Sequence, residues 1–468
     1  MGKLKSLKLQ NIGRIQEAEV RFGDLTVLVG PQATGKSIFL QFLKLAVDKQ
    51  YIHEQLRKHG IEWGDDVRAF LDVYLGEGMQ GVWQAEGENK SSIWVDGKLC
   101  PIDTLITGRR PKKGRAPVQR VFYIPAQRVL SLANGWPRPF QGFSSQDPFA
   151  VRDFSETFRL LMEQEFIHTE DLFPKTNRLK EPYRDLLAKH LFGGFGLYVD
   201  RHGAQKRLVL QRQDDQEHKG PAIPFMAWSA GQREFIPLLV GLYWLIPARR
   251  VRRRADIQWV IMEELEMGLH PNAIAVVLLL VLELLWRGYR VCLSTHSLHV
   301  LDIVWAIQKI KQYQADTTRL LDIFKVRKSD PLKEVAEAVG KKEIRVYYFD
   351  YEGKAHDISG LDPGTDEQAE AGWGGLTDFS SRVNDMVAKI VASSTRKSRS
   401  ASPKKPEAPH GPDDRAPPSD KFPALQPFSP SEETESREAP LPPSEKLEKA
   451  SDLSSLENSS SAAPETPP

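Results

Sequence analysis

A glycine-rich octapeptide between an apolar strand and an apolar-periodic helix constrains this chain more than any other feature. Residues 25–30, LTVLVG, predict a buried strand, and residues 30–37 read GPQATGKS. Apolar residues then recur at helical spacing over about 37–47. Glycines let successive backbone N–H groups face phosphate oxygens, and the start of the following helix adds partial positive charge. We therefore expect an α/β fold with a phosphate-binding loop at a strand end.

The loop also supplies the side chains that a nucleoside triphosphate needs. Lys36 can reach the β- and γ-phosphates, and the Ser37 hydroxyl can coordinate Mg²⁺. The position of the loop between a strand and a helix argues against a chance match. We therefore expect ATP and Mg²⁺ as cofactors, with a binding set of Gly30, Gln32, Thr34, Gly35, Lys36 and Ser37.

Two adjacent carboxylates end a second apolar strand. Residues 257–270 read IQWVIMEELEMGLH, which places Glu263 and Glu264 at the carboxyl end of the strand. Downstream of a phosphate loop, the first carboxylate can help to hold Mg²⁺ through water, and the second can act as general base. Two glutamates at a strand end are otherwise often a solvated edge, so this assignment depends on the loop upstream.

Two shorter motifs lie on either side of this strand in the sequence. Residues 228–232, WSAGQ, offer a hydroxyl and backbone N–H groups to an anion, although an ordinary helix cap is the alternative. His296 follows the apolar strand RVCLST within STHS, where it can hydrogen-bond a γ-phosphate or be a surface histidine. The order of all four motifs is more specific than any one of them.

In that order the motifs resemble those of the ABC-type ATPases, and of the soluble branch that includes SMC proteins, RecF and the overcoming-lysogenization-defect (OLD) family. That branch carries an initial strand like LKLQNIGRIQEAEV, then GPNGSGKS, a serine-glycine-glutamine signature, a D-E-P-E-x-x-L-H-P block and a T-H-S. This chain has GPQATGKS, WSAGQRE, EELEMGLHP and STHS. The resemblance covers residues 1–47 and about 221–310 well and 50–220 poorly. It is strongest to the OLD-like heads of bacterial defence systems, including ATPases of the PARIS kind.

The resemblance implies a role for each matching residue. Ser229 and Gly231 are expected to touch the γ-phosphate held by the opposite subunit, and we include Gln232 in the nucleotide-binding set. Glu264 corresponds to the catalytic base and His296 to the switch histidine. The heads are therefore expected to form a homodimer or higher homo-oligomer around ATP.

Members of the family also carry a glutamine that contacts Mg²⁺. Gln127, in YIPAQR just past a strand, is the candidate, and Gln80 and Gln84 remain alternatives. Arg128 beside it is expected either to contact nucleotide or to cap an acidic surface. The expected metal set is Ser37, Gln127 and Glu263.

Three departures from the family pattern matter. Glu263 stands where the family has aspartate, Leu265 replaces a proline, and Gln32-Ala33 replaces asparagine-glycine. Ala33 must then adopt a conformation that glycine takes more easily. Together these changes suggest competent binding and slow hydrolysis.

The motif positions and the resemblance, with a change of composition near residue 394, imply four parts: 1–50 as the N-terminal part of the head, 51–220 as an inserted lobe with remaining head strands, 221–393 as the C-terminal part of the head, and 394–468 as a tail. The tail is rich in Pro, Ser, Glu and Lys and poor in apolar residues, so we expect disorder. The predicted architecture is a P-loop NTPase head of the ABC type with a mixed sheet, an inserted helical lobe and this disordered tail.

Charge and cysteine content narrow the partners and the compartment. The formal net charge is only +2, so nucleic-acid binding would need local patches. Two such clusters occur at Arg109–Arg115 and Arg249–Arg254, and either is a DNA-binding or a solvated loop. Two cysteines and no signal peptide fit the cytoplasm. The apolar stretch Ile274–Trp286 is too short to span a membrane, so we expect a buried helix and no membrane association.

The function favoured by this reading is an ATP-driven switch that senses infection in bacterial anti-phage defence and controls a separate effector. The acids after His296 lack a pairing that indicates a nuclease in this chain. The rival functions are a DNA-repair ATPase of the RecF/SMC type that acts directly on DNA, and a scaffold that binds ATP without turnover.

Overall fold

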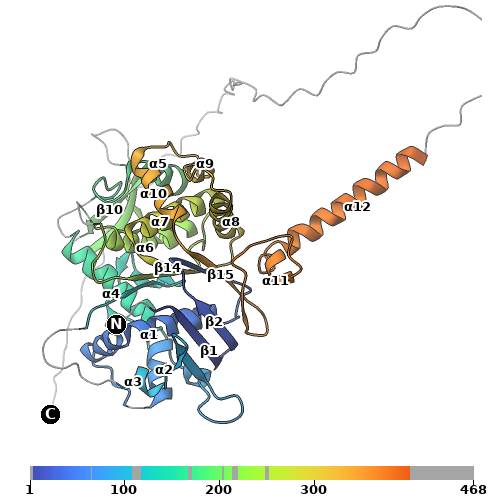
Figure 1. Ribbon diagram of the computed structural model, residues 1–468. Coiled ribbons are helices and arrows are strands. Elements are labelled where there is room, and N and C mark those ends of the chain that lie inside the picture. Colours follow the sequence, from blue (N-terminus) through green and yellow to red (C-terminus); the bar gives the residue numbers. More distant parts are fainter. Residues whose placement is uncertain are drawn as a thin grey trace, which may run out of the picture. The chain divides into compact units, whose positions relative to one another are not determined.

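A six-stranded sheet forms the centre of the described structure (Figure 1). The computed structural model describes residues 4–64, 66–107, 117–166, 171–202, 205–212, 220–247 and 252–400. The strand order is β16-β15-β3-β14-β13-β6, in which β16 alone is antiparallel to its neighbour. The predicted mixed sheet is therefore confirmed. Its strands are β3 (Leu25–Val29), β6 (Val121–Ile124), β13 (Trp259–Glu263), β14 (Arg290–Thr295), β15 (Ile344–Phe349) and β16 (Ala355–Asp357).

Both faces of this sheet are buried, because successive side chains of each strand point to opposite faces. Val27 and Val29 belong to one apolar core, whereas Leu28 between them belongs to the other. The same alternation separates Val260 from Ile261 on β13. A sheet covered on both faces requires near-continuous apolar strands, which is why LTVLV and WVIM carry no polar alternation.

The N-terminal segment forms a hairpin, which belongs to a separate antiparallel sheet of order β2-β1-β4-β5. Its register pairs Leu7 with Val20 and Leu9 with Ala18, and all four side chains are buried. Those side chains share one core with Phe39 of helix α1. The strands are β1 (Ser6–Ile12), β2 (Ile15–Arg21), β4 (Ser92–Val95) and β5 (Lys98–Leu99).

Helix α1 (Lys36–Lys58) starts directly after the phosphate loop and is longer than the predicted helix. It bends at Asp48, whose φ of −114° and ψ of 15° are not helical. The carboxylate of Asp48 accepts the backbone N–H groups of Arg120 (2.9 Å) and Val121 (2.8 Å), so the bend holds the start of β6. Helices α2 (Val67–Leu75) and α3 (Asp103–Ile106) and the short η1 (Met79–Val82) follow.

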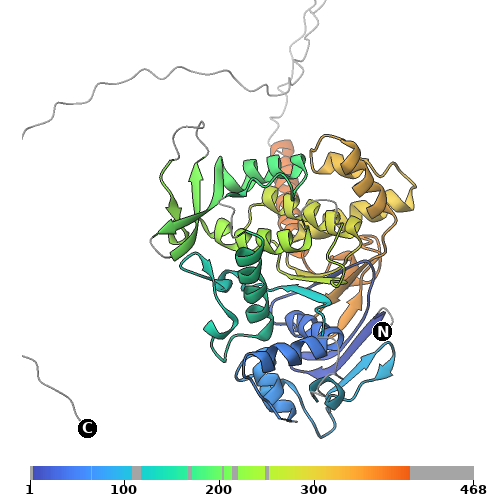
Figure 2. The same cartoon turned by 90° about the vertical axis from the view of Figure 1, so that its left-hand side faces the viewer.

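The inserted region combines helices with a second antiparallel sheet, which periodicity did not predict. Its four strands have the order β12-β11-β10-β9, and the β10–β11 hairpin is green in Figure 2. The strands are β9 (Asp171–Phe173), β10 (Phe195–His202), β11 (Gln205–Arg212) and β12 (Ile223–Pro224), with a small hairpin of β7 (Leu132–Ala133) and β8 (Trp136–Pro137). The helical elements are η2 (Arg128–Ser131), η3 (Phe140–Gly142), α4 (Phe149–Gln164), α5 (Glu181–Leu187), η4 (Ala188–Phe192) and η5 (Phe225–Ala227).

Five described helices follow before β15 in the C-terminal part of the head, and all of them are labelled on one side of the sheet in Figure 1. They are α6 (Ala230–Leu245), α7 (Pro271–Arg287), α8 (Leu298–Gln312), α9 (Arg319–Ile323) and α10 (Asp330–Gly340). The stretch Ile274–Trp286 lies in α7 and is largely buried, as predicted. Its Glu283 is 1% exposed and accepts hydrogen bonds from Tyr183 and Arg287, both at 2.9 Å. The apolar-periodic stretch 300–324 forms two helices, α8 and α9.

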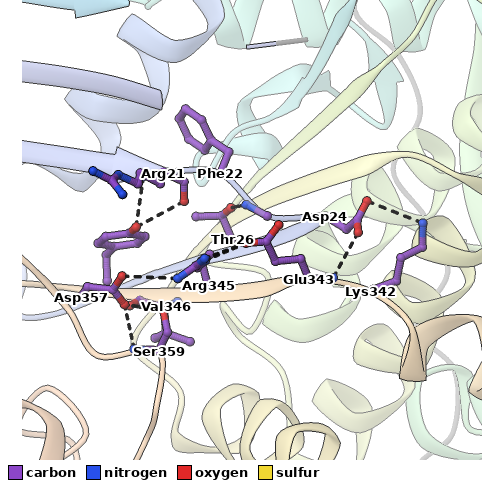
Figure 3. Close-up of polar contacts among 12 residues, drawn as sticks. Arg21, Phe22, Asp24, Thr26, Lys342, Glu343, Arg345, Val346, Asp357 and Ser359 are labelled. Carbon is purple, nitrogen blue, oxygen red and sulfur yellow. Dashed lines mark hydrogen bonds and ion pairs between the residues drawn. The ribbon is translucent and has the colours of Figure 1, made fainter. Parts of the chain in front are cut away.

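Polar contacts fix β15 beside β3 at the edge of the head (Figure 3). Asp24 accepts the backbone N–H of Glu343 at 3.1 Å and forms an ion pair with Lys342 at 3.6 Å. Arg345 pairs with Glu343 at 2.8 Å and with Asp357 of β16 at 3.8 Å. The Arg345 contacts tie the two strands of the β15–β16 hairpin together, and the Asp24 contacts hold it beside the strand that leads to the phosphate loop.

The chain after this hairpin is helical further than predicted. Helix α11 (Gln368–Ala371) precedes α12 (Asp378–Ser400), so the predicted start of the disordered tail at residue 394 is wrong for 394–400. The rest of the predicted tail, 401–468, lies outside the described residues, as does the basic cluster Arg109–Arg115.

Candidate nucleotide-binding site

The phosphate loop adopts backbone conformations that few residues other than glycine accept. Gly30 and Gly35 have φ of 143° and 97°, and a Cβ on Gly30 would lie 2.2 Å from the carbonyl oxygen of Phe349. Ala33 has φ of 60°, in the left-handed region, as its position in the loop predicted. The loop therefore has the shape that turns backbone N–H groups toward an anion.

Lys36 is folded back over the loop. Its Nζ donates to the carbonyl oxygens of Gly30 (2.9 Å) and Pro31 (2.6 Å) and to the Thr34 hydroxyl (3.3 Å). Burial lowers the pKa of Lys36 to about 8, although Glu264 and Glu266 act in the opposite direction. A bound phosphate would restore the favoured charged form, because it places negative charge beside the ammonium group.

Glu263 ends β13 in a buried position that fits a metal-bound water. Its Oε2 accepts the backbone N–H of Ala126 at 3.1 Å, and its Oε1 has no hydrogen-bond partner among the described residues. Burial raises the pKa of Glu263, although the hydroxyls of Ser37 and Tyr123 lower it. An orphaned carboxylate oxygen facing Ser37 is the donor set that Mg²⁺ prefers when it keeps several waters.

Glu264 has a left-handed backbone with φ of 44°. Its backbone N–H donates to the carbonyl of Ser294 on β14 at 3.0 Å. Its Oε1 lies 3.3 Å from Nε2 of His296, and this hydrogen bond lowers the pKa of the Glu264 carboxyl. The carboxylate is therefore held ionised, in the state that a general base needs.

One cavity brings these groups together. It has a volume of about 360 Å³ and lies between the phosphate loop, the end of β13 and the turn after β14. The sequence-predicted residues at this cavity are Gln32, Thr34, Gly35, Lys36, Ser37, Glu264 and His296. Pattern reasoning missed Arg14, which also lines it and comes from the turn between β1 and β2.

The predicted signature residues are not part of that cavity. Ser229 caps helix α6 and is exposed. Its hydroxyl accepts the Gln232 N–H at 3.3 Å, and the Gln232 side chain accepts the Ser229 N–H at 3.0 Å. A Cβ on Gly231 would lie 2.8 Å from the carbonyl oxygen of Gly268, so α6 approaches the loop after β13 closely. The motif is thus both a helix cap and a surface open to a second molecule.

Glu266 is a second residue that the sequence did not single out. It accepts hydrogen bonds from the Thr295 hydroxyl (2.8 Å) and the His296 N–H (2.6 Å). Glu266 therefore fixes the turn that presents His296 to Glu264. Its place in the EELE run was the available signal, but only the fold shows that it faces β14.

The three candidate glutamines lie in different places. Gln127 is exposed, does not line the cavity, and follows Ala126, whose N–H donates to Glu263. The backbone N–H of Gln80 donates to Asp72 at 2.9 Å, and Gln84 lines a different cavity with Gln10 and Lys354. The metal contact of Gln127 stays a prediction, with Gln80 and Gln84 as the alternatives.

The arginines of the second basic cluster that the structure describes make hydrogen bonds and ring contacts within the chain. Arg253 donates to the Gly288 carbonyl at 2.9 Å, and Arg254 donates to the Trp244 carbonyl at 2.9 Å and stacks on the Trp244 ring at 4.0 Å. Arg252 stacks on Trp286 at 4.8 Å. DNA binding at this cluster therefore stays a prediction. No helix among the described residues is long and apolar enough to cross a membrane.

Residues 128–302 match the sequence model of the family described as "AAA domain, putative AbiEii toxin, Type IV TA system". This segment includes the signature, both glutamates and His296. No curated protein sequence matches the chain significantly.

Similar solved structures include an SMC head bound to the C-terminal winged-helix domain of ScpA, with 10% identity and a TM-score of 0.33 over 64% of this chain and 91% of that chain. The SMC head domain from Thermotoga maritima has 12% identity and a TM-score of 0.28 over 64% and 92%. The post-hydrolysis dimer of the ATP-binding cassette MJ0796, bound to ADP and Pi, has 10% identity and a TM-score of 0.28 over 75% and 98%.

Proposed function

We propose that this chain, an ABC/SMC-like P-loop ATPase, binds ATP with Mg²⁺ beside Lys36 and hydrolyses it between two copies of its head. The observation that supports this most directly is that the predicted site residues lie in two separate places on the head. One cavity joins Lys36, Glu264 and His296, whereas Ser229 does not line it and is exposed. A second head can supply that missing wall, which is the arrangement the motif order implies.

Each residue at the cavity has a role in this proposal. Lys36 and the loop N–H groups bind the β- and γ-phosphates, and Ser37 and Glu263 hold Mg²⁺, with Gln127 as the further candidate ligand. Glu264 takes the proton of the attacking water, and His296 keeps the Glu264 carboxylate oriented and ionised. Slow turnover follows if the longer Glu263 side chain holds the metal-bound water less firmly than the aspartate of related proteins.

The biological role in this proposal is a cytoplasmic switch in bacterial anti-phage defence. ATP-dependent pairing of heads would favour one state and hydrolysis the other, and a separate effector protein would respond to the change. The family description, which names a toxin–antitoxin system, supports a place in a system of more than one component. The resemblance to OLD-like heads supports the defence role.

The test measures ATP hydrolysis and self-association together on the wild type, Glu264→Gln and Lys36→Ala. We expect the wild type to turn over ATP, Glu264→Gln to accumulate as an ATP-dependent higher-order species, and Lys36→Ala to do neither. If the wild type neither hydrolyses ATP nor changes size with it, the switch proposal fails. Hydrolysis that rises strongly with duplex DNA at low salt, and falls as salt is added, would instead favour the DNA-repair function.

A further inference from the structure

We propose that Arg128 is the positioning residue for Glu264, and that it ties the catalytic base to the signature helix α6. The proposal rests on the proposed function, because it assigns Glu264 the role of base. Arg128 begins η2, shortly after β6, and is fully buried, with 0% exposure. Its charge is therefore not placed there by contact with solvent.

The guanidinium group of Arg128 binds the backbone around Glu264. Nη1 donates to the carbonyl oxygens of Glu263 at 3.2 Å and Glu264 at 3.3 Å, and Nη2 donates to the Glu264 carbonyl at 3.3 Å. Two donors thus meet one carbonyl. The planar fork of arginine can do this, whereas the single ammonium of lysine cannot reproduce the geometry.

This contact falls on a conformationally strained part of the site. Glu264 has φ of 44°, which a residue with a Cβ adopts only when its surroundings hold it. Ser294 holds its N–H and Arg128 holds its carbonyl. Because both peptide groups are fixed, the Glu264 side chain leaves the backbone toward His296 and the cavity.

The other end of the guanidinium group is anchored on α6. Nε donates to the Glu234 carbonyl at 3.0 Å, and the Glu234 carboxylate lies 3.7 Å from Nε. Glu234 is in the first turns of the helix that Ser229 caps. Arg128 therefore joins the surface expected to meet a second head with the backbone of the base that acts in the same chain.

Arg178 provides a matched control. Its side chain is also nearly buried, at 4% exposure, and Nη1 donates to the α6 carbonyl of Tyr243 at 2.7 Å and to the Ile246 carbonyl at 3.2 Å. Its described hydrogen bonds and ion pair are with the far end of α6 and with Glu165, not with Glu264. Arg178→Lys thus removes a buried guanidinium group that binds α6, but it leaves the contacts of Glu264 unchanged.

The first experiment compares kcat and KM for ATP in Arg128→Lys and Arg178→Lys, with thermal stability measured on both. We expect Arg128→Lys to lose about 10²-fold in kcat with little change in KM, because a misplaced base slows the chemical step without weakening binding. Arg178→Lys should lose stability and keep its kcat. An Arg128→Lys kcat equal to that of Arg178→Lys would overturn the proposal, whereas a wild type without hydrolysis would refute the proposed function instead.

A second experiment mixes heads that carry different substitutions. It tests whether Arg128 acts through Glu264 of the same chain or through the signature residue Ser229. Lys36→Ala heads mixed with Ser229→Arg heads should regain turnover, because one composite site combines an intact loop with an intact signature. Lys36→Ala heads mixed with Arg128→Lys heads should stay inactive, since the only intact loop then lies in the chain whose Glu264 is misplaced. Recovery in the second mixture would show that Arg128 acts through Ser229 and would refute a role on Glu264.

Discussion

His296 Nε2 lies 3.3 Å from Glu264 Oε1, across the gap between the turn after β14 and the end of β13. The hydrogen bond from His296 is the largest influence on the pKa of Glu264 and lowers it, more than burial raises it. The histidine that the sequence suggested for a γ-phosphate thus already has a partner within its own head.

This contact predicts a shift in the pH dependence of hydrolysis. Glu264 acts as a base only when ionised, so its lowered pKa preserves activity toward acid pH. His296→Ala removes the hydrogen bond, lets the pKa of Glu264 rise, and should move the acidic limb of the kcat profile to higher pH. The measurement is kcat from about pH 4 to pH 8.

His299→Ala is the control for this profile. His299 lies in the first turn of α8, the helix that follows His296. It pairs with Asp302 at 3.7 Å and does not line the cavity. Its profile should overlay that of the wild type. An unshifted acidic limb in His296→Ala would contradict the assigned role.

Glu263→Gln should stabilise the nucleotide-free protein while it weakens hydrolysis. Burial raises the pKa of Glu263, so its ionised form costs free energy in the folded state at neutral pH. A neutral amide removes that cost, and the gain should shrink as pH falls toward about 4, where the unfolded carboxyl also binds a proton. Thermal unfolding at several pH values and the Mg²⁺ dependence of hydrolysis measure the two effects.

Glu62→Gln in an exposed loop serves as the control and should change neither quantity. A lower melting temperature for Glu263→Gln at pH 7 would show that the carboxylate stabilises the empty head, contrary to the burial argument.

Ala33→Gly should stabilise the head and preserve ATP binding. A left-handed residue with a Cβ costs roughly 1–2 kcal/mol, and the extra flexibility of glycine in the unfolded chain offsets part of that. We expect a net gain of up to about 1 kcal/mol in the free energy of unfolding. Chemical denaturation measures it, with Ala46→Gly in the helical part of α1 as the control, which should lose about 1 kcal/mol. Equal losses in both variants would contradict the strain at Ala33.

Local patterns predicted most of the site, because each motif joins a strand end to the residues that follow it. The loop at 30–37, both glutamates and His296 needed only strand periodicity and their order. The left-handed Ala33 followed from the resemblance, because the family pattern has a glycine where this chain has Ala33. The sequence did not predict the antiparallel sheet of the inserted lobe. Its strands β9 and β12 are too short to show an alternation of polar and apolar residues.

Arg128 was expected to contact nucleotide or to cap an acidic surface, but it is buried and does not line the cavity. The contacts of Arg128 and Glu266 were not predictable because their partners are distant in sequence. Arg128 meets Glu234 and Glu264 only after β6, α6 and β13 are packed together. Glu266 reads as one more acid in a run until β14 pairs with β13 and brings Thr295 beside it. The helix α12 was not predicted although Val383, Val387 and Ile390 recur at helical spacing, because these apolar side chains are exposed and only the later part of the helix is as polar as the segment that follows.

The close approach of Gly231 to Gly268 gives the most direct test of head pairing. A Cβ at Gly231 would lie 2.8 Å from a backbone oxygen, so an alanine there must displace either the start of α6 or the loop after β13. The P-loop cavity does not include Gly231, so Gly231→Ala should still bind ATP as a single head. Gly231→Ala should lose ATP-dependent pairing in the Glu264→Gln background, and sedimentation velocity measures this pairing.

Gly81→Ala is the control, because a Cβ there meets nothing within 4 Å, and it should pair normally. If Gly231→Ala pairs as well as Gly81→Ala does, then α6 is not the surface that meets the second head, and the capping box at Ser229 is a helix cap alone.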